Sequence, residues 1–302
     1  MSKSTKWFLL IFSMLLVVGV VFTFLFYSAI RSVSDGSKEV VTVGRGAKLA
    51  LVELVGEIRS SEDIIRQLKK YREDSSIKGI LLRIDSPGGA VVPSQEMYEE
   101  VRKTRDVKPV VVSMGSLAAS GGYYVAVGAT KLVANRGTLT GSIGVIAEFL
   151  QVQEAMKKLG VDIKTVKSGK LKDAGTPVRN MSAEAEKYFQ WLLDDVHRQF
   201  VTVVEQERKL KHSDALALSD GRVYTGEQAI ELGLVDTLGT YEDAVRIAAE
   251  LSGIDGDPAI VKEREKKKFF DRMFGDVGES ISDIKEAILQ KPIMSYRFIG
   301  PF

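Results

Sequence analysis

The apolar and polar positions in the first half of the chain fall into two alternating patterns. Residues 48–55, 79–84 and 109–113 are short, nearly continuous apolar runs, which are typical of buried strands. Residues 60–74 and 94–105 carry apolar residues at helical spacing between polar ones. Strands that alternate with helices at these intervals predict an α/β fold with a largely parallel sheet.

The second half of the chain is predicted to be more helical. Helices are expected over residues 151–159 and after Ser182, Thr225 and Thr240, each of which is a favoured N-cap residue. Residues 163–166 are predicted to form a short strand. The chain contains no internal repeat and no low-complexity tract.

The N-terminal segment has the composition of a membrane anchor. Residues 7–30 form an uninterrupted run of uncharged, mostly apolar residues. As a helix this run would be about 36 Å long, enough to cross the hydrocarbon core of a bilayer. A cleaved signal peptide is the alternative, but its apolar region is normally only about 7–15 residues. Lys3 and Lys6 precede the run, which predicts a cytoplasmic N-terminus and a catalytic body outside the cytoplasm.

Composition excludes several classes of function. The chain of 302 residues contains no cysteine, which excludes thiol catalysis and cysteine-bound zinc. It has two histidines and no His-Glu-x-x-His arrangement, so a metal site is not expected. The formal net charge of +2 gives no sign of a nucleic-acid partner. We therefore expect an enzyme without a cofactor or metal.

Ser120 is the candidate nucleophile. It follows the strand predicted at 109–113 and precedes a helix predicted at 123–127, so its hydroxyl is expected near unpaired helical N–H groups. Gly121 and Gly122 would let the backbone turn sharply and a substrate carbonyl approach closely. Such a site suits acyl transfer, although an isolated Ser-Gly-Gly is more often a packing turn.

The base that would activate this serine is not settled by the residues alone. His197 lies in an amphipathic helical stretch and His212 in a polar one, and neither stands in a glycine-rich turn beside a candidate acid. A Ser-His-Asp triad is therefore disfavoured, and a lysine kept neutral by burial is the remaining choice. Lys167, Lys170 and Lys172 lie in one glycine-containing stretch and are equal candidates.

A second glycine-rich turn is the candidate oxyanion site. Residues 85–89, Asp-Ser-Pro-Gly-Gly, follow a predicted buried strand and could present bare backbone N–H groups. Together with the amide of Gly121, they could hold the oxyanion of a tetrahedral intermediate. A common Pro-Gly turn is the alternative interpretation.

Five ordered motifs resemble one peptidase family. They are the stretches 84–89 (IDSPGG), 119–124 (ASGGYY), 139–144 (LTGSIG), 167–172 (KSGKLK) and 221–226 (GRVYTG). Together they resemble the short, single-pass form of signal peptide peptidase A, a family of serine peptidases related in fold to Clp protease and crotonases. The resemblance covers roughly residues 45–255 and implies a Clp protease/crotonase-like fold of repeated β-β-α units.

The resemblance also implies roles for individual residues. Ser120 matches the nucleophile and Lys172 the general base, a choice that the chemistry left open. Ser142 matches a serine that orients the lysine, and Gly89 and Gly121 match the oxyanion amides, with Gly88 as a neighbouring alternative. One Ser-Lys pair per chain is expected. The family forms ring-like homo-oligomers, described as dome-shaped octamers, whose dyads combine residues of adjacent subunits.

The expected function is that of a membrane-anchored serine endopeptidase which degrades remnant signal peptides and other apolar peptides through an acyl-enzyme. Four parts are predicted: an anchor (1–30), a linker (31–46), the peptidase domain (47–255) and a basic, amphipathic tail (256–302). In related enzymes a C-terminal segment can be self-processed and occupy the groove, and residues 294–299 are a candidate occupant. A crotonase-like acyl-CoA enzyme and a non-catalytic membrane scaffold are the alternatives.

Overall fold

The structure is a computed structural model that describes residues 7, 13–21, 23, 38–265 and 294–298. It divides into two compact units, Met1–Val41 with Glu263–Ile281 and Thr42–Lys262 with Ser282–Phe302. In the first unit, the described residues of the predicted anchor are helical and exposed. Within the described ranges, no helix is both long enough and apolar enough to span a bilayer. The remainder of residues 7–30 lies outside these ranges.

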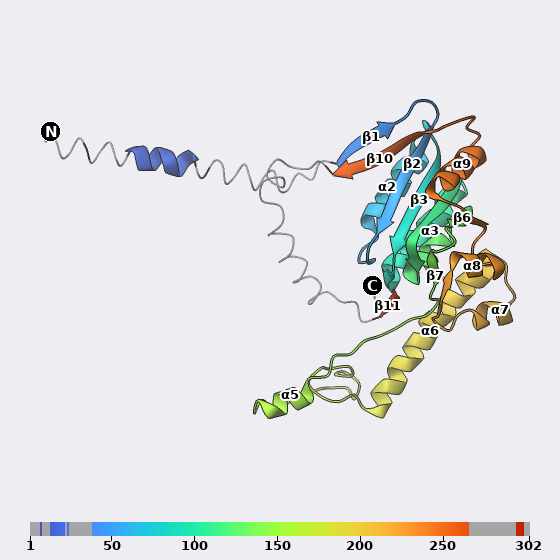
Figure 1. The fold of residues 1–302 in the computed structure, drawn as a ribbon. Helices are drawn as coiled ribbons and strands as arrows, with labels where there is room; N and C mark the ends of the chain where they lie inside the picture. Colours follow the sequence, from blue (N-terminus) through green and yellow to red (C-terminus); the bar gives the residue numbers. More distant parts are fainter. Residues whose placement is uncertain (1–6, 8–12, 22, 24–37, 266–293, 299–302) are drawn as a thin grey trace. The chain divides into compact units, whose positions relative to one another are not determined.

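The second unit is built on a mostly parallel sheet (Figure 1). Its central parallel strands are, in spatial order, β2 (Lys48–Val55), β3 (Ile77–Ser86), β5 (Val110–Ala119), β6 (Lys131–Ala134) and β9 (Thr237–Leu238). The order continues beyond β2 with β10 (Ala259–Glu265), which is parallel to β2, and then with β1 (Lys38–Val43). Two short strands complete it: β7 (Leu139–Gly141), parallel to the end of β5, and β8 (Val223–Thr225), antiparallel to β7.

Both faces of the sheet are buried, which explains why its strands have continuous apolar runs. Alternate residues of β3 point to opposite faces: Ile80 and Leu82 enter one core, and Leu81 enters the other. The larger core is covered by α2 (Glu62–Glu73), α3 (Val91–Arg105), α4 (Gly121–Ala126) and part of α6 (Ala183–Arg208). The smaller core is covered by α9 (Tyr241–Leu251).

Three predicted helix starts are confirmed by their caps. The side chain of Ser182 accepts a hydrogen bond from the Ala185 amide at the start of α6. Thr225 and Thr240 each form a capping box at the start of α8 (Gly226–Glu231) and α9. The other elements are short: β4 (Gly88–Ala90), α5 (Gln153–Lys158), α7 (His212–Ala217) and β11 (Ser295–Arg297).

The strand predicted over residues 163–166 is wrong. These residues form no regular element, and Val166 is 90% exposed. An apolar run becomes a strand only beside a strand edge, and within the described chain no strand lies against it. Parts of the expected linker and tail contribute to sheets instead, as β1, β10 and β11.

Replacement of Leu82 by alanine tests the importance of the larger core. Leu82 has no exposed surface in the centre of β3, so Leu82→Ala should lower the free energy of unfolding by about 2–5 kcal/mol. Val55→Ala is the control, because Val55 is 69% exposed, and it should change that free energy by no more than about 0.5 kcal/mol. Urea unfolding followed by circular dichroism measures both, and equal losses would contradict the assignment of the core.

Candidate active site

Ser120 joins β5 to α4 in a strained conformation. Its φ of 52° and ψ of −116° lie in a region that residues other than glycine rarely adopt. The Ser120 amide donates to the Gly141 carbonyl at 2.7 Å, and the Ser120 carbonyl accepts from the Tyr124 amide at 2.8 Å. The serine is therefore held on one side by the neighbouring strand and on the other by the first turn of α4.

Ser142 lies beside Ser120 at the same edge of the sheet. Ala119 in β5 is paired with Gly141 in β7, so the two serines directly follow two neighbouring parallel strands. Ser142 also has a positive φ, 50°, and its amide donates to the Arg222 carbonyl at 2.8 Å. Both serines line one cavity of about 500 Å³. The structure thus brings together two of the residues singled out by the sequence motifs.

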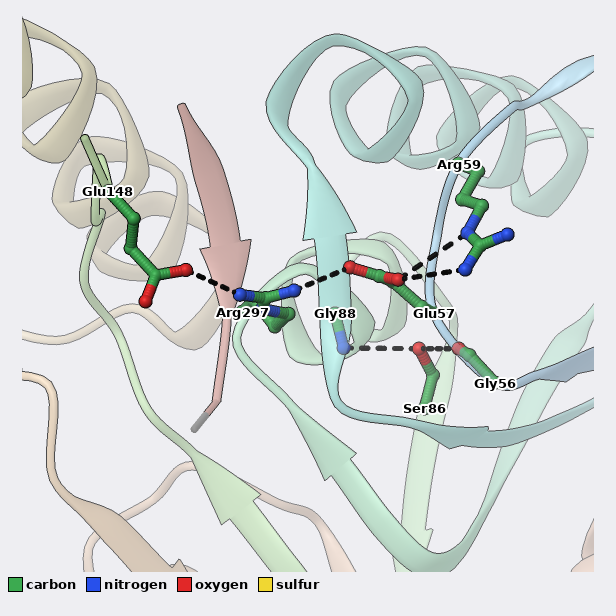
Figure 2. Close-up of polar contacts among 7 residues, drawn as sticks. All are labelled: Gly56, Glu57, Arg59, Ser86, Gly88, Glu148 and Arg297. Carbon is green, nitrogen blue, oxygen red and sulfur yellow. Dashed lines mark hydrogen bonds and ion pairs between the residues drawn. The ribbon is translucent and has the colours of Figure 1, made fainter. Parts of the chain in front are cut away.

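The Gly88-Gly89 turn is held by hydrogen bonds to the buried Ser86 side chain and to Ile58. Figure 2 shows that Ser86 donates to the Gly56 carbonyl, at 2.7 Å, and accepts from the Gly88 amide, at 3.1 Å. Ile58 bonds to the flanking groups, donating to the Gly88 carbonyl at 2.8 Å and accepting from the Ala90 amide at 2.7 Å. The amide of Gly88 is therefore occupied, whereas the peptide groups of Gly89 face the other side of β4.

The backbone of Gly88 lies against that of Gly121. A Cβ atom built on Gly88 would lie 2.0 Å from the carbonyl oxygen of Tyr296 and 2.5 Å from the amide nitrogen of Gly121. A side chain at this position is excluded by that contact and by the φ of 92°. The two glycine-rich turns, which lie on separate strands, thus meet beside Ser120.

A C-terminal strand, β11, lies between β4 and Ile146 and occupies the groove that these two backbone edges form beside Ser120. β11 pairs antiparallel with β4, with Tyr296 opposite Gly89 and Arg297 opposite Gly88. The Phe298 amide donates to the Pro87 carbonyl at 2.8 Å. On its other side, Ser295 exchanges two hydrogen bonds with Ile146, at 3.0 and 3.1 Å. This position agrees with the expectation that residues 294–299 occupy the groove, although Ile299 lies outside the described residues.

The side chain of Tyr296 fills an aromatic pocket. It has no exposed surface, stacks on Tyr124 with ring centroids 5.2 Å apart, and packs on Phe200 at 4.8 Å. Its hydroxyl donates to the Val196 carbonyl at 3.2 Å. Burial raises the pKa of Tyr124 to about 12 and also raises the pKa of Tyr296. Both phenols therefore stay protonated at neutral pH, which excludes them as general bases.

The structure does not bring Lys172 to Ser120 within one chain. Lys172 is exposed in the turn between α5 and α6, which Figure 1 places away from the sheet, and no lysine lines the Ser120 cavity in the described residues. Lys167 contacts Asp173, and its hydrogen bond lowers the pKa of that carboxyl, while Lys170 lies 2.5 Å from Glu184. Lys172 has no ion pair within the described ranges.

His197 is a cavity residue that the sequence analysis did not place there. Its ring lines the Ser120 cavity, and its Nε2 donates to the Ser219 carbonyl at 2.7 Å. No hydrogen bond in the described structure joins this ring to Ser120. One face of α6 carries a polar stripe at helical spacing, formed by Gln190, Asp194 and His197. This stripe is the sequence signal that could have placed His197 in the cavity. His212 is exposed and pairs with Glu205 at 2.9 Å.

A strained serine between strand and helix, beside a glycine-lined groove that holds an extended peptide, is the arrangement of a serine peptidase. The comparisons with known proteins agree: residues 45–146 match Clp protease and residues 102–255 match Peptidase family S49. The chain belongs to Peptidase family S49 and is a serine peptidase with a Clp protease-like α/β fold.

The relatives carry peptidase names. A protein named as a protease in Synechocystis is 43% identical over 70% of this chain and 76% of its own length. One named as a protease in Methanocaldococcus jannaschii is 36% identical over 83% of this chain and 86% of its own length. One named as signal peptide peptidase SppA in Enterococcus faecium is 41% identical over 61% of this chain and 54% of its own length.

Ser86→Ala tests the support of the glycine turn. The change leaves the buried Gly88 amide, and the Gly56 carbonyl, without their partner, so the free energy of unfolding should fall by about 1–3 kcal/mol. Ser116→Ala is the control, because Ser116 is exposed on the same sheet, and its effect should stay within about 0.5 kcal/mol. Thermal or urea unfolding measures both, and an unchanged stability of Ser86→Ala would contradict the hydrogen-bond assignment.

Proposed function

We propose that Ser120 is the nucleophile of this peptidase and that the amides of Gly89 and Gly121 stabilise the oxyanion. The observation that carries this proposal is the position of β11, whose Tyr296 carbonyl oxygen lies against Gly88 and Gly121. Phe298 and Pro87 are hydrogen-bonded in the β4–β11 ladder. Because hydrogen-bonded pairs alternate in an antiparallel ladder, Tyr296 and Gly89 form the next such pair. An extended substrate would present its carbonyl in the same way.

The chemistry then follows the acyl-enzyme route. The Ser120 oxygen attacks the peptide carbonyl while a base takes its proton, and the two amides hold the oxyanion. The base returns the proton to the leaving amine, and water hydrolyses the acyl-enzyme. Gly88 is a poor third donor, because its amide already bonds to Ser86.

Lys172 of a neighbouring copy is the proposed base, with Ser142 orienting its amine. Lys167 and Lys170 are each engaged by a carboxylate, of Asp173 and of Glu184, whereas Lys172 contacts none among the described residues. Ser142 lines the Ser120 cavity, so an amine that enters the cavity from another subunit would meet both hydroxyls. The resemblance to signal peptide peptidase A, whose dyads combine adjacent subunits, supports the same arrangement.

Residues 150–191 form the arm that carries Lys172, and the side chains exposed on this arm are of the kind that contact another copy of the chain. Large apolar side chains are exposed along it, namely Leu150, Leu159, Val161, Ile163, Val166 and Trp191. Exposed apolar side chains of this density mark interaction sites more often than free surface. We infer a homo-oligomeric ring, for which the resembled family gives an octamer, in which this arm reaches the next subunit.

The proposed substrates are apolar peptides, including remnant signal peptides at the membrane. The extended strand in the groove favours a peptide substrate over an acyl-CoA, and the aromatic pocket suits an apolar side chain. The uncharged run of residues 7–30 supports a single-pass anchor with the N-terminus in the cytoplasm. The catalytic unit would then work on the outer side of the cell membrane.

Labelling with a fluorophosphonate probe tests the nucleophile. The probe should modify the wild-type chain once, in the peptide that contains Ser120, and mass spectrometry locates the adduct. Ser120→Ala should fold normally, take no label and lose at least about 10³-fold in peptide cleavage. The matched control Ser116→Ala should be labelled like the wild type. An adduct on another residue would move the nucleophile there.

Mixed oligomers test whether the base comes from another subunit. Ser120→Ala and Lys172→Ala should each be inactive alone. Co-assembled in equal amounts, they should recover about a quarter of wild-type activity, because that share of sites joins an intact serine to an intact lysine. Lys170→Ala is the control and should keep most of its activity. A mixture that stays inactive, while each variant still oligomerises, would place the dyad within one chain or the base elsewhere.

A further inference from the structure

Arg297 of β11 lies between two glutamates of the catalytic unit (Figure 2). One guanidinium nitrogen, Nη1, is 2.9 Å from Glu57 Oε1, and the other, Nη2, is 2.8 Å from Glu148 Oε2. Glu57 also lies 3.4 Å from Arg59. The Arg297 side chain is only 19% exposed, so the pair of contacts is partly shielded from water.

The two glutamates belong to the walls of the groove and not to the strand that occupies it. Glu57 follows β2, one residue before Ile58, which is bonded to β4. Glu148 lies two residues after Ile146, which is bonded to Ser295. Any extended peptide that replaced β11 between these two backbone edges would therefore meet the same two carboxylates.

The buried tyrosine fixes which residue faces the glutamates. Tyr296 enters the aromatic pocket, and side chains alternate along an extended strand, so the next residue points to the opposite side. That residue, Arg297, is the one between Glu57 and Glu148. A one-residue shift of the register would remove the ring from its pocket and place an aromatic side chain between the carboxylates.

We propose that Glu57 and Glu148 form a subsite which selects a basic side chain directly after the cleaved bond. The preferred peptides then carry an aromatic residue followed by arginine or lysine. This inference rests on the proposed function, in which the carbonyl of the residue in the aromatic pocket is the one attacked. A glutamate after the cleaved bond would add a third carboxylate to the pair and be rejected by repulsion.

Three peptides that differ at one position test this selection on the full chain. They contain Tyr-Arg, Tyr-Gln or Tyr-Glu at the cleaved bond and are otherwise identical. The kcat/KM should decrease in that order, with Tyr-Arg about fivefold above Tyr-Gln at low salt and less at high salt. Equal values for the three peptides would overturn the subsite while leaving the peptidase assignment intact.

Reversal of charge at Glu148 gives the sharper result. The Glu148 side chain is 58% exposed and contacts only Arg297 among the described side chains, so Glu148→Lys should fold. It should invert the ratio of Tyr-Arg to Tyr-Glu cleavage, and a gain on Tyr-Glu cannot result from misfolding. Glu148→Gln should bring the Tyr-Arg to Tyr-Gln ratio closer to one. Glu250→Lys is the matched control. Glu250 is exposed on α9, which covers the smaller core, and its replacement should leave both ratios as in the wild type.

These experiments distinguish a failure of the proposed peptidase function from a failure of the subsite formed by Glu57 and Glu148. If the wild-type chain cleaved none of the three peptides and behaved like Ser120→Ala, the proposed function would fall and the subsite with it. If the wild type cleaved all three and Glu148→Lys left their ratios unchanged, only the subsite would be overturned.

Discussion

The parallel pairing of β5 with β3 and β7 is the constraint on which the groove depends. The Ser120 amide extends the ladder by one bond to Gly141, which fixes the serine at the carboxyl end of its strand. The carboxyl ends of neighbouring parallel strands meet at one edge of a sheet. Glu57 follows β2, Gly88 follows β3 and Ser142 follows β7 at that same edge. One pattern of backbone hydrogen bonds thus brings Ser120, the two glycine turns and Glu57 to one edge of the sheet.

Much of this arrangement was predictable from the sequence, because local signals determine it. Strands buried on both faces must be continuously apolar, so β2, β3 and β5 were recognisable as runs. Ser182, Thr225 and Thr240 marked helix starts because their side chains satisfy free amide groups. Ser120 directly follows β5, Ser142 directly follows β7 and Gly89 lies three residues after β3, so the parallel pairing of these strands brings the three residues to one edge of the sheet.

The features that escaped prediction depend on partners distant in sequence. The run at residues 163–166 has strand composition but no strand edge beside it, so its prediction was wrong. The register of β11 against β4 is set by the shape of the pocket around Tyr296, which no short motif encodes. His197 lines the cavity because it lies on the same face of α6 as Gln190 and Asp194, and only the packing of α6 decides which face that is. The role of Lys172 remains a proposal, because a single chain leaves it exposed and outside the Ser120 cavity.

Because β11 belongs to the same chain as the groove it occupies, any incoming peptide must compete with β11 for binding. A tethered segment reaches an effective concentration of about 1 mM, independent of the amount of protein in solution. A free peptide at micromolar concentration displaces β11 from the groove only if its intrinsic affinity is far higher than that of the tethered strand. Dilution cannot empty the site. Under the proposed function, weakly binding peptides would be kept out by β11, and only peptides that fit both the aromatic pocket around Tyr296 and the pair Glu57 and Glu148 would displace it.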